Sequence, residues 1–283
     1  MIAIVGGLGA ALFFTAATLS SSRGTRLIGA PSLLAGVMLV GLAIALPLVA
    51  ASGIPAGLGW VEVGWLALAG GGNVAGLLCA YGALRTGKVG IVAPVVSTEG
   101  AIAAVIALVT GERVRATTGA MLAVIAGGIL LAGMARDEDP EAVEARTGRA
   151  FALSVVAAGC FGASLYATGR VSAQLPIPWA LLPARLVGVA AVALPLILTA
   201  RLRITRRALP FVAISGCCEI GGFAAFAFGA RHGIAVSAVL ASQFAGLSTV
   251  AAFFLFHERL SRIQLAGVTA IVAGVAVLSA VQS

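Results

Sequence analysis

The chain has 283 residues, of which 60% are hydrophobic and only 10% charged, and its mean hydropathy is +1.11. Soluble domains carry about 25% charged residues, so this composition excludes a soluble enzyme, a coiled coil and a disordered chain. The net charge of +8 would suggest nucleic acid as the partner of a soluble protein, but here the basic residues lie singly or in short groups between apolar runs. In that arrangement they are expected to orient the chain in a lipid bilayer.

Ten apolar runs follow one another along the chain. A helix needs about 20 apolar residues to cross the hydrocarbon core of a bilayer, and helices satisfy their backbone hydrogen bonds internally. We therefore expect an all-α membrane protein with ten transmembrane helices. The runs cover residues 2–19, 30–51, 60–84, 89–110, 116–135, 150–169, 177–200, 208–230, 234–256 and 262–281.

The long hydrophilic stretch of the chain, 136–149, lies almost at its midpoint and is rich in acidic residues. It is expected to be a charged linker between two halves, 1–135 and 150–283, with five spans each. The halves are similar in sequence: 87–113 aligns without gaps on 233–259, and the sequence at 45–48 recurs at 193–196.

Because five is an odd number, the second half would enter the membrane in the opposite sense. The sequence thus predicts two inverted five-helix repeats. Secondary transporters use this architecture to place a site near the midplane that either side of the membrane can reach.

The ends of the two halves carry a family resemblance. The first half contains VAPVVSTEG and then ALVTGERV, and the second contains VLASQFAGL and then FFLFHERLSRIQLAGVTAIVAGVAVL. With Glu-Arg after the fourth and the ninth span, the chain resembles the EamA-type members of the drug/metabolite transporter superfamily over nearly its whole length. The following glycine differs between the halves, since Gly119 lies seven residues after Glu112 whereas Gly267 lies nine after Glu258. The resemblance implies a carrier of small metabolites, most commonly amino acids, with a cavity lined by helices of both repeats.

Lys and Arg are distributed unequally between the two sides of the predicted bundle. Thirteen follow the odd-numbered spans, whereas four lie on the opposite side. Because cytoplasmic loops retain an excess of Lys and Arg, we expect a multi-pass protein of the inner cell membrane with both termini outside. In the family, by contrast, both termini are usually cytoplasmic.

Two glutamates lie within the predicted spans. Glu99 falls in the middle of the fourth span, directly after Ser97 and Thr98, and Glu219 falls in the middle of the eighth. A charged side chain near the centre of a membrane helix costs about 2.5–3.5 kcal/mol on insertion scales, so its retention needs a partner, a wet cavity or a function. Either carboxyl could bind a substrate amino group or exchange a proton, or it could be a neutral acid bonded to a neighbouring helix.

Other polar residues extend this candidate substrate-binding site. In the repeat alignment Asn73 matches Glu219 and Gln243 matches Ser97, so two pairs of polar residues are expected at matching depths. They could equally bond helices together along tightly packed seams. Tyr81 lies about two turns after Asn73 on part of the same face. The aromatic residues Tyr166, Phe223 and Phe226 could line the same cavity, or could face lipid or the core as phenylalanines in membrane spans commonly do. For Arg185 in the seventh span, an ion pair with Glu219 or Glu99 is favoured over the binding of a substrate carboxylate.

These residues predict a secondary transporter, an exporter or facilitator of small metabolites, with amino acids as the expected class. Two alternatives stay open: a proton-coupled multidrug or cation antiporter, and a non-transporting membrane receptor or assembly subunit. The sequence has no Walker lysine motif and no H-E-x-x-H motif, so neither enzymatic activity nor a cofactor or metal is expected, with the proton as the one coupling ion considered. The expected partners are a small-molecule substrate and the lipid bilayer, without nucleic acid, and the expected state is a monomer or weak homodimer.

Overall fold

The computed structural model describes residues 1–55, 57–86, 92, 95–133, 144–244, 246–247 and isolated positions between 263 and 277. Throughout this part of the chain the regular secondary structure is helical. Six helical segments of the described residues are long and apolar enough to cross a membrane. The chain is therefore a multi-pass α-helical membrane protein.

The helices follow the apolar runs of the sequence. In chain order they are α1 (Ile2–Ile28), α2 (Ala30–Ser52), α3 (Trp60–Thr86), α5 (Glu99–Val109), α6 (Ala116–Gly133), α7 (Glu144–Gln174), α8 (Ile177–Gly188), a π-helical turn η1 (Val189–Ala193), α9 (Leu194–Leu198), α10 (Leu209–Ala230) and α11 (Ile234–Ala241).

A single residue, Gly29, joins α1 to α2. Its φ of 79° lies in the left-handed region that glycine adopts without steric cost, and Pro31 follows in the first turn of α2, where its missing N–H is not needed. Helix α1 continues to Ile28, well past the predicted end at residue 19. Arg23 and Arg26 therefore belong to the end of a helix, where basic side chains are favoured by the helix dipole.

Several predicted boundaries are wrong. Helix α7 begins at Glu144, so the last residues of the predicted linker 136–149 are helical. The span predicted at 177–200 is found as Ile177–Leu198, with the π-helical turn η1 between α8 and α9. Six spanning segments are found among the described residues, where ten spans were predicted for the whole chain. The shorter α5 and α6 cover parts of the fourth and fifth predicted spans, and most of 262–281 lies outside the described residues.

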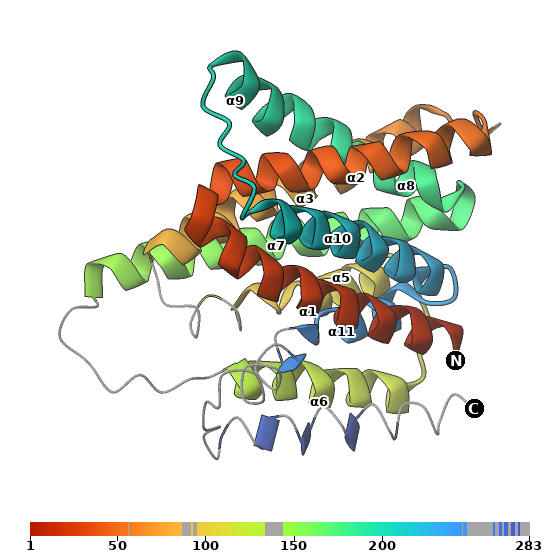
Figure 1. Ribbon diagram of the computed structural model, residues 1–283. Helices are drawn as coiled ribbons and strands as arrows, with labels where there is room; N and C mark the ends of the chain where they lie inside the picture. Colours follow the sequence, from red (N-terminus) through yellow and green to blue (C-terminus); the bar gives the residue numbers. More distant parts are fainter. Residues whose placement is uncertain are drawn as a thin grey trace.

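The helices pack in pairs that recur between the two halves of the chain. Helix α1 packs along α10, whereas α3 packs along α7. Helix α2 contacts α8 and α10, and α3 also contacts α8. Helix α5 contacts α7 and α11, and α11 also contacts α1, with α6 on the outside of this group (Figure 1).

Small residues permit these close approaches. A Cβ atom on Gly6 of α1 would lie 2.6 Å from the backbone nitrogen of Gly229 in α10, and one on Gly70 of α3 would lie 2.6 Å from the carbonyl carbon of Pro183 in α8. Small residues at helix contacts are typical of membrane bundles, because helices associate there by van der Waals packing rather than by the hydrophobic effect.

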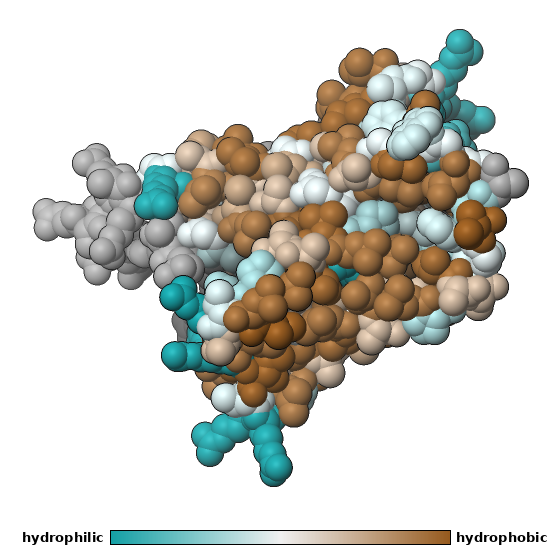
Figure 2. Space-filling view, turned by 90° about the horizontal axis from the view of Figure 1, so that it is seen from above, coloured by the Kyte–Doolittle hydropathy of each residue, from teal (hydrophilic) through white to brown (hydrophobic). Residues whose placement is uncertain are grey.

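The outer surface of the bundle is apolar. In Figure 2 hydrophobic residues cover most of the face in view, and hydrophilic residues gather toward its edges. Large apolar side chains such as Val5, Leu12 and Leu198 are more than half exposed. An apolar surface of this extent fits contact with lipid.

Candidate functional site

Two of the apolar segments are interrupted by turns near the middle of the molecule. A turn at Ser97 and Thr98 precedes α5, and another at Ser242 and Gln243 follows α11. The Thr98 hydroxyl donates a hydrogen bond to the carbonyl of Val95 at 2.7 Å, and the Ser242 hydroxyl donates to the carbonyl of Val239 at 2.9 Å. Short polar side chains thus satisfy carbonyls that a broken helix leaves without partners.

The two interruptions touch each other. A Cβ atom on Gly100, at the start of α5, would collide with the carbonyl oxygen of Ala238 and with the side chain of Ser242. Glu99, expected in the middle of a continuous helix, instead lies in the first turn of α5. Backbone N–H groups without intrahelical partners concentrate partial positive charge at this end of the helix, which favours a carboxylate there.

A cavity of about 240 Å³ lies beside the interruptions. It is lined by residues of α1, α2, α3, α5, α7 and α10 and by residues near both turns. Four of the predicted site residues line it: Asn73, Tyr81, Glu99 and Glu219. The other four, Ser97, Thr98, Arg185 and Gln243, do not.

Glu99 is a buried acidic residue of the cavity lining. Its side chain is 7% exposed, and none of the described residues forms a hydrogen bond or ion pair with its carboxyl group. A buried carboxylate without a partner is costly, and such groups persist in proteins where a ligand or a wet cavity compensates them. Glu99 is thus placed to receive a group that enters the cavity.

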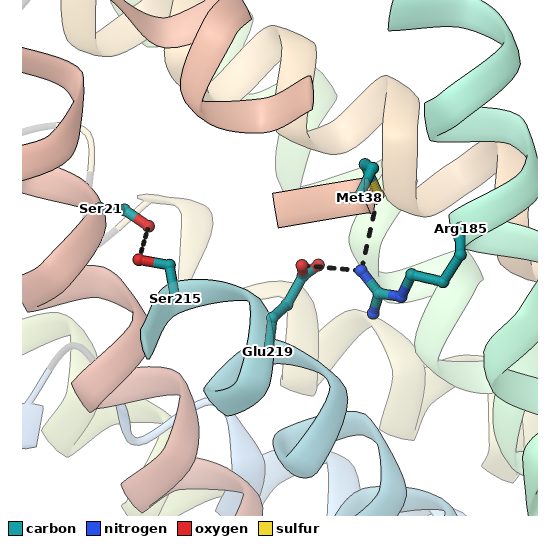
Figure 3. Close-up of polar contacts among 5 residues, drawn as sticks. All are labelled: Ser21, Met38, Arg185, Ser215 and Glu219. Atoms are coloured by element: carbon teal, nitrogen blue, oxygen red, sulfur yellow. Dashed lines mark hydrogen bonds and ion pairs between the residues drawn. The ribbon is translucent and has the colours of Figure 1, made fainter. Parts of the chain in front are cut away.

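Glu219, by contrast, has a partner within the protein. Its Oε2 atom accepts a hydrogen bond from Nη1 of Arg185 at 2.7 Å, which is the ion pair considered for these residues from the sequence (Figure 3). Nη1 also contacts the sulfur of Met38 at 3.5 Å, and the guanidinium lies 5.9 Å from the centre of the Phe223 ring.

The arginine has space because of a glycine. A Cβ atom on Gly41 of α2 would lie 2.6 Å from Cδ of Arg185, so the absence of a side chain there admits the stem of the arginine. Arg185 is 1% exposed, and its Nε has no hydrogen-bond partner among the described residues. The guanidinium is therefore paired with Glu219 and does not itself line the cavity.

Hydroxyl groups form a second polar patch in the cavity. Ser21 of α1 donates a hydrogen bond to Ser215 of α10 at 3.1 Å (Figure 3). The side chain of Tyr81 lies beside Ser21 and close to the carboxylate of Glu219. Sequence reasoning missed both serines, because serine carries little hydropathy signal. The spacing between Ser215 and Glu219 could have identified one of them, since residues four apart share a helix face.

Aromatic rings form much of the apolar wall. Phe14, Phe161, Phe223 and Phe244 line the cavity, and the ring of Phe14 meets those of Phe223 and Phe244 edge to face at 5.3 and 6.3 Å. Of the aromatic residues that the sequence suggested besides Tyr81, only Phe223 lines it. Phe226 is buried in the core, and the Tyr166 hydroxyl donates to Thr110 at 2.9 Å.

Hydrogen bonds connect the helices at the end of the bundle where α5 ends and α11 begins. The carboxylate of Glu112, the residue of the first Glu-Arg pair, accepts hydrogen bonds from the backbone N–H groups of Ile234 and Ala235 at 3.1 Å each. Arg231 donates to the carbonyls of Ser172 and Leu175 at the end of α7, at 2.5 and 2.9 Å. Glu112 therefore caps α11 from outside that helix.

The fold has a counterpart among solved proteins. A structure described only as "Crystal structure of protein" matches with a TM-score of 0.80, over 99% of this chain and 96% of its own, at 19% sequence identity. At that identity the likeness shows the fold alone. No protein-family model matches the chain, and neither does any curated protein.

Proposed function

We propose that the chain is a secondary transporter of the EamA type, which carries small metabolites by alternating access; amino acids are the class that the family resemblance implies. The observation that carries the proposal is the pair of touching helix interruptions beside a cavity that contains Glu99, whose carboxyl group has no partner among the described residues. Discontinuous helices at the midplane are how many secondary transporters build a solute site, because freed backbone groups and helix ends can then face the solute.

The proposed architecture is ten spans in two inverted repeats. In the proposed repeat, α1 corresponds to α7, α3 to α10, and α5 to α11. The contact of α1 with α10 then corresponds to that of α7 with α3, and the contact of α5 with α7 corresponds to that of α11 with α1. All four contacts are present. Local details support the same relation. Gly76 of α3 packs on the ring of Phe161 in α7, and Gly222, 146 residues later, packs on the ring of Phe14 in α1.

Alternating access requires one end of the cavity to close while the other opens. The residues of α1 that line the cavity, Phe14 to Thr25, lie in the C-terminal half of that helix. The lining residues of α3, Asn73 to Tyr81, also lie toward the C-terminal end of their helix. The contacts of Glu112 and Tyr166 lie at the opposite end. In the proposed cycle these contacts break when that end opens.

The proposed location is the inner cell membrane, with both termini outside. The support is the thirteen-to-four distribution of Lys and Arg, which places the ends of α1 and α3 in the cytoplasm. In this orientation the cavity extends toward the cytoplasmic side.

A proton-coupled cation antiporter is a second candidate. It is favoured by the absence of a partner for Glu99 among the described residues, since a carboxylate that accepts either a proton or a cation can couple two fluxes.

Counterflow in proteoliposomes tests the proposal. A panel of amino acids, polyamines and quaternary cations is measured with and without an imposed pH gradient, for the wild type and for Glu99→Gln. Saturable flux without the gradient supports a facilitator, and flux that requires it supports the antiporter. If no solute is moved and Glu99→Gln lowers only the folding yield, the chain is a receptor or assembly subunit and the proposal is wrong.

A further inference from the structure

The cavity contains one acidic side chain for which the described residues offer no basic partner. Among the described residues that line it, the ionisable acids are Glu99 and Glu219, and there is no Lys, Arg or His. Glu219 is neutralised by Arg185 at 2.7 Å, so that pair contributes no net charge. The start of α5 supplies only a partial positive charge, about half of an elementary charge, so an ionised Glu99 still favours a cationic ligand beside it.

The walls of the cavity also favour a cation over an anion. Four phenylalanine rings line it, and the faces of aromatic rings attract ammonium groups electrostatically. The hydroxyls of Ser21 and Ser215 are engaged with each other. The guanidinium that could bind a carboxylate, that of Arg185, is held by Glu219 outside the lining.

From these observations, and resting on the proposed transport function, we infer that the solute is a small amine cation with an apolar body and no carboxylate. Its ammonium group binds the carboxylate of Glu99, and its body packs against the rings of Phe14 and Phe161, which line the cavity from α1 and α7. An amino acid zwitterion would also bring a carboxylate into a low-dielectric cavity whose described lining residues include no cation to meet it.

The size of the cavity limits the body of this amine. At about 240 Å³ it lies just below the usual range for ligand pockets, roughly 300–1,000 Å³. A solute with one aromatic ring and a short amine chain is therefore the appropriate probe, and a large polycyclic drug is not.

Isothermal titration calorimetry of the purified full-length protein in detergent distinguishes the classes with three matched probes. They are 2-phenylethylamine, phenylalanine and 3-phenylpropionate, which share a phenyl ring and a two-carbon chain and differ in their charged groups. We expect 2-phenylethylamine to bind at least tenfold more tightly than phenylalanine, and 3-phenylpropionate not to bind. This comparison uses the wild-type chain and does not depend on a variant that folds.

A pair of variants then tests the role of Glu99. Glu99→Gln removes the charge with little change of shape and is expected to abolish the preference for the amine. Glu62→Gln is the matched control, because Glu62 lies at the start of α3 outside the cavity and accepts a hydrogen bond from the backbone of Gly59. That variant is expected to retain the preference.

Equal or tighter binding of phenylalanine would overturn the inference and leave the transporter proposal intact. Failure of all three probes to bind would also overturn it. In that case the counterflow panel distinguishes the amine inference from the transporter proposal. Flux of any solute supports the proposed transport function, whereas the absence of flux contradicts the transport function and the amine inference together.

Discussion

Arg185 and Glu219 show how a bundle in lipid can hold a charged pair. Both side chains are removed from water, so each is tolerated because the other is present at 2.7 Å. Removal of one partner leaves an uncompensated charge in a low-dielectric interior. Breaking a buried pair in this way costs about 3–5 kcal/mol, while replacement of both partners is often neutral.

We therefore predict strong coupling between these two residues. Arg185→Met or Glu219→Gln alone should lower the free energy of unfolding by about 3–5 kcal/mol, and the double variant should recover most of that loss. Unfolding in detergent, followed by circular dichroism and analysed as a double-mutant cycle, measures the coupling. Additive effects of the two substitutions would show that the pair does not act as a unit.

At the same scale, polar residues in apolar spans were the useful sequence signal. Glu99, Glu219, Asn73 and Tyr81 were predicted in this way and meet at one cavity. Gln243 was predicted to join them, but its place in a turn directs it elsewhere, and its Nε2 is buried without a hydrogen-bond partner among the described residues.

Apart from Phe223, the phenylalanines of the wall, Phe14, Phe161 and Phe244, could not be selected from the sequence. A phenylalanine in a membrane span faces lipid, core or cavity with the same hydropathy, and only packing decides among them. Phe14 lines the cavity and Phe226 is wholly buried in the core, although both lie in equally apolar helices.

At the scale of elements, the contact between α5 and α11 holds the two interruptions together. Gly100 has no space for a side chain, because a Cβ atom there would collide with the backbone of Ala238 and with Ser242. Gly119 of α6, by comparison, has no atom within 4 Å of the position of its Cβ. These two glycines provide a matched pair of substitutions.

Gly100→Ala is predicted to push α5 away from α11 and to lower the free energy of unfolding by about 1–3 kcal/mol, as overpacking of a tight contact does. Gly119→Ala should be neutral or stabilising by up to about 1 kcal/mol, because alanine favours the helix. Thermal unfolding in detergent compares the two. An equal loss of stability in both variants would contradict the close contact at Gly100.

The sequence predicted most helices and misplaced several of their ends. A hydropathy run measures how long an apolar segment is, not whether its backbone remains hydrogen-bonded throughout. It therefore gave no sign of the π-helical turn η1 between α8 and α9, and none of the turn at Ser97 and Thr98 beyond the polar residues themselves. Helix α7 begins before its apolar run, because charged residues can extend a helix beyond the hydrocarbon region.

At the scale of the whole molecule, the predicted repeat relates the helices of the two halves pair by pair. The gapless alignment of 87–113 on 233–259 places Gly100 on Gly246 and Ser97 on Gln243, and α5 and α11 do contact each other. The alignment could not show that α1 packs on α10, a helix of the other half. This contact buries helix faces made of small residues, and a comparison of sequences does not measure such burial.

The orientation of the bundle is the remaining property of the whole molecule, and it decides which side the cavity faces. Four arginines, Arg201, Arg203, Arg206 and Arg207, lie between α9 and α10, whereas 53–59, between α2 and α3, has no basic residue. We predict that the first segment is cytoplasmic and the second external.

In a variant with Cys79, Cys160, Cys217 and Cys218 replaced by alanine, Gly57→Cys should react with a membrane-impermeant maleimide in intact cells, and Thr205→Cys should react only after permeabilisation. Both positions are exposed, so a difference in labelling reports sidedness rather than burial. The reverse pattern would place both termini in the cytoplasm, as is usual in the family, and the cavity would then extend toward the outside.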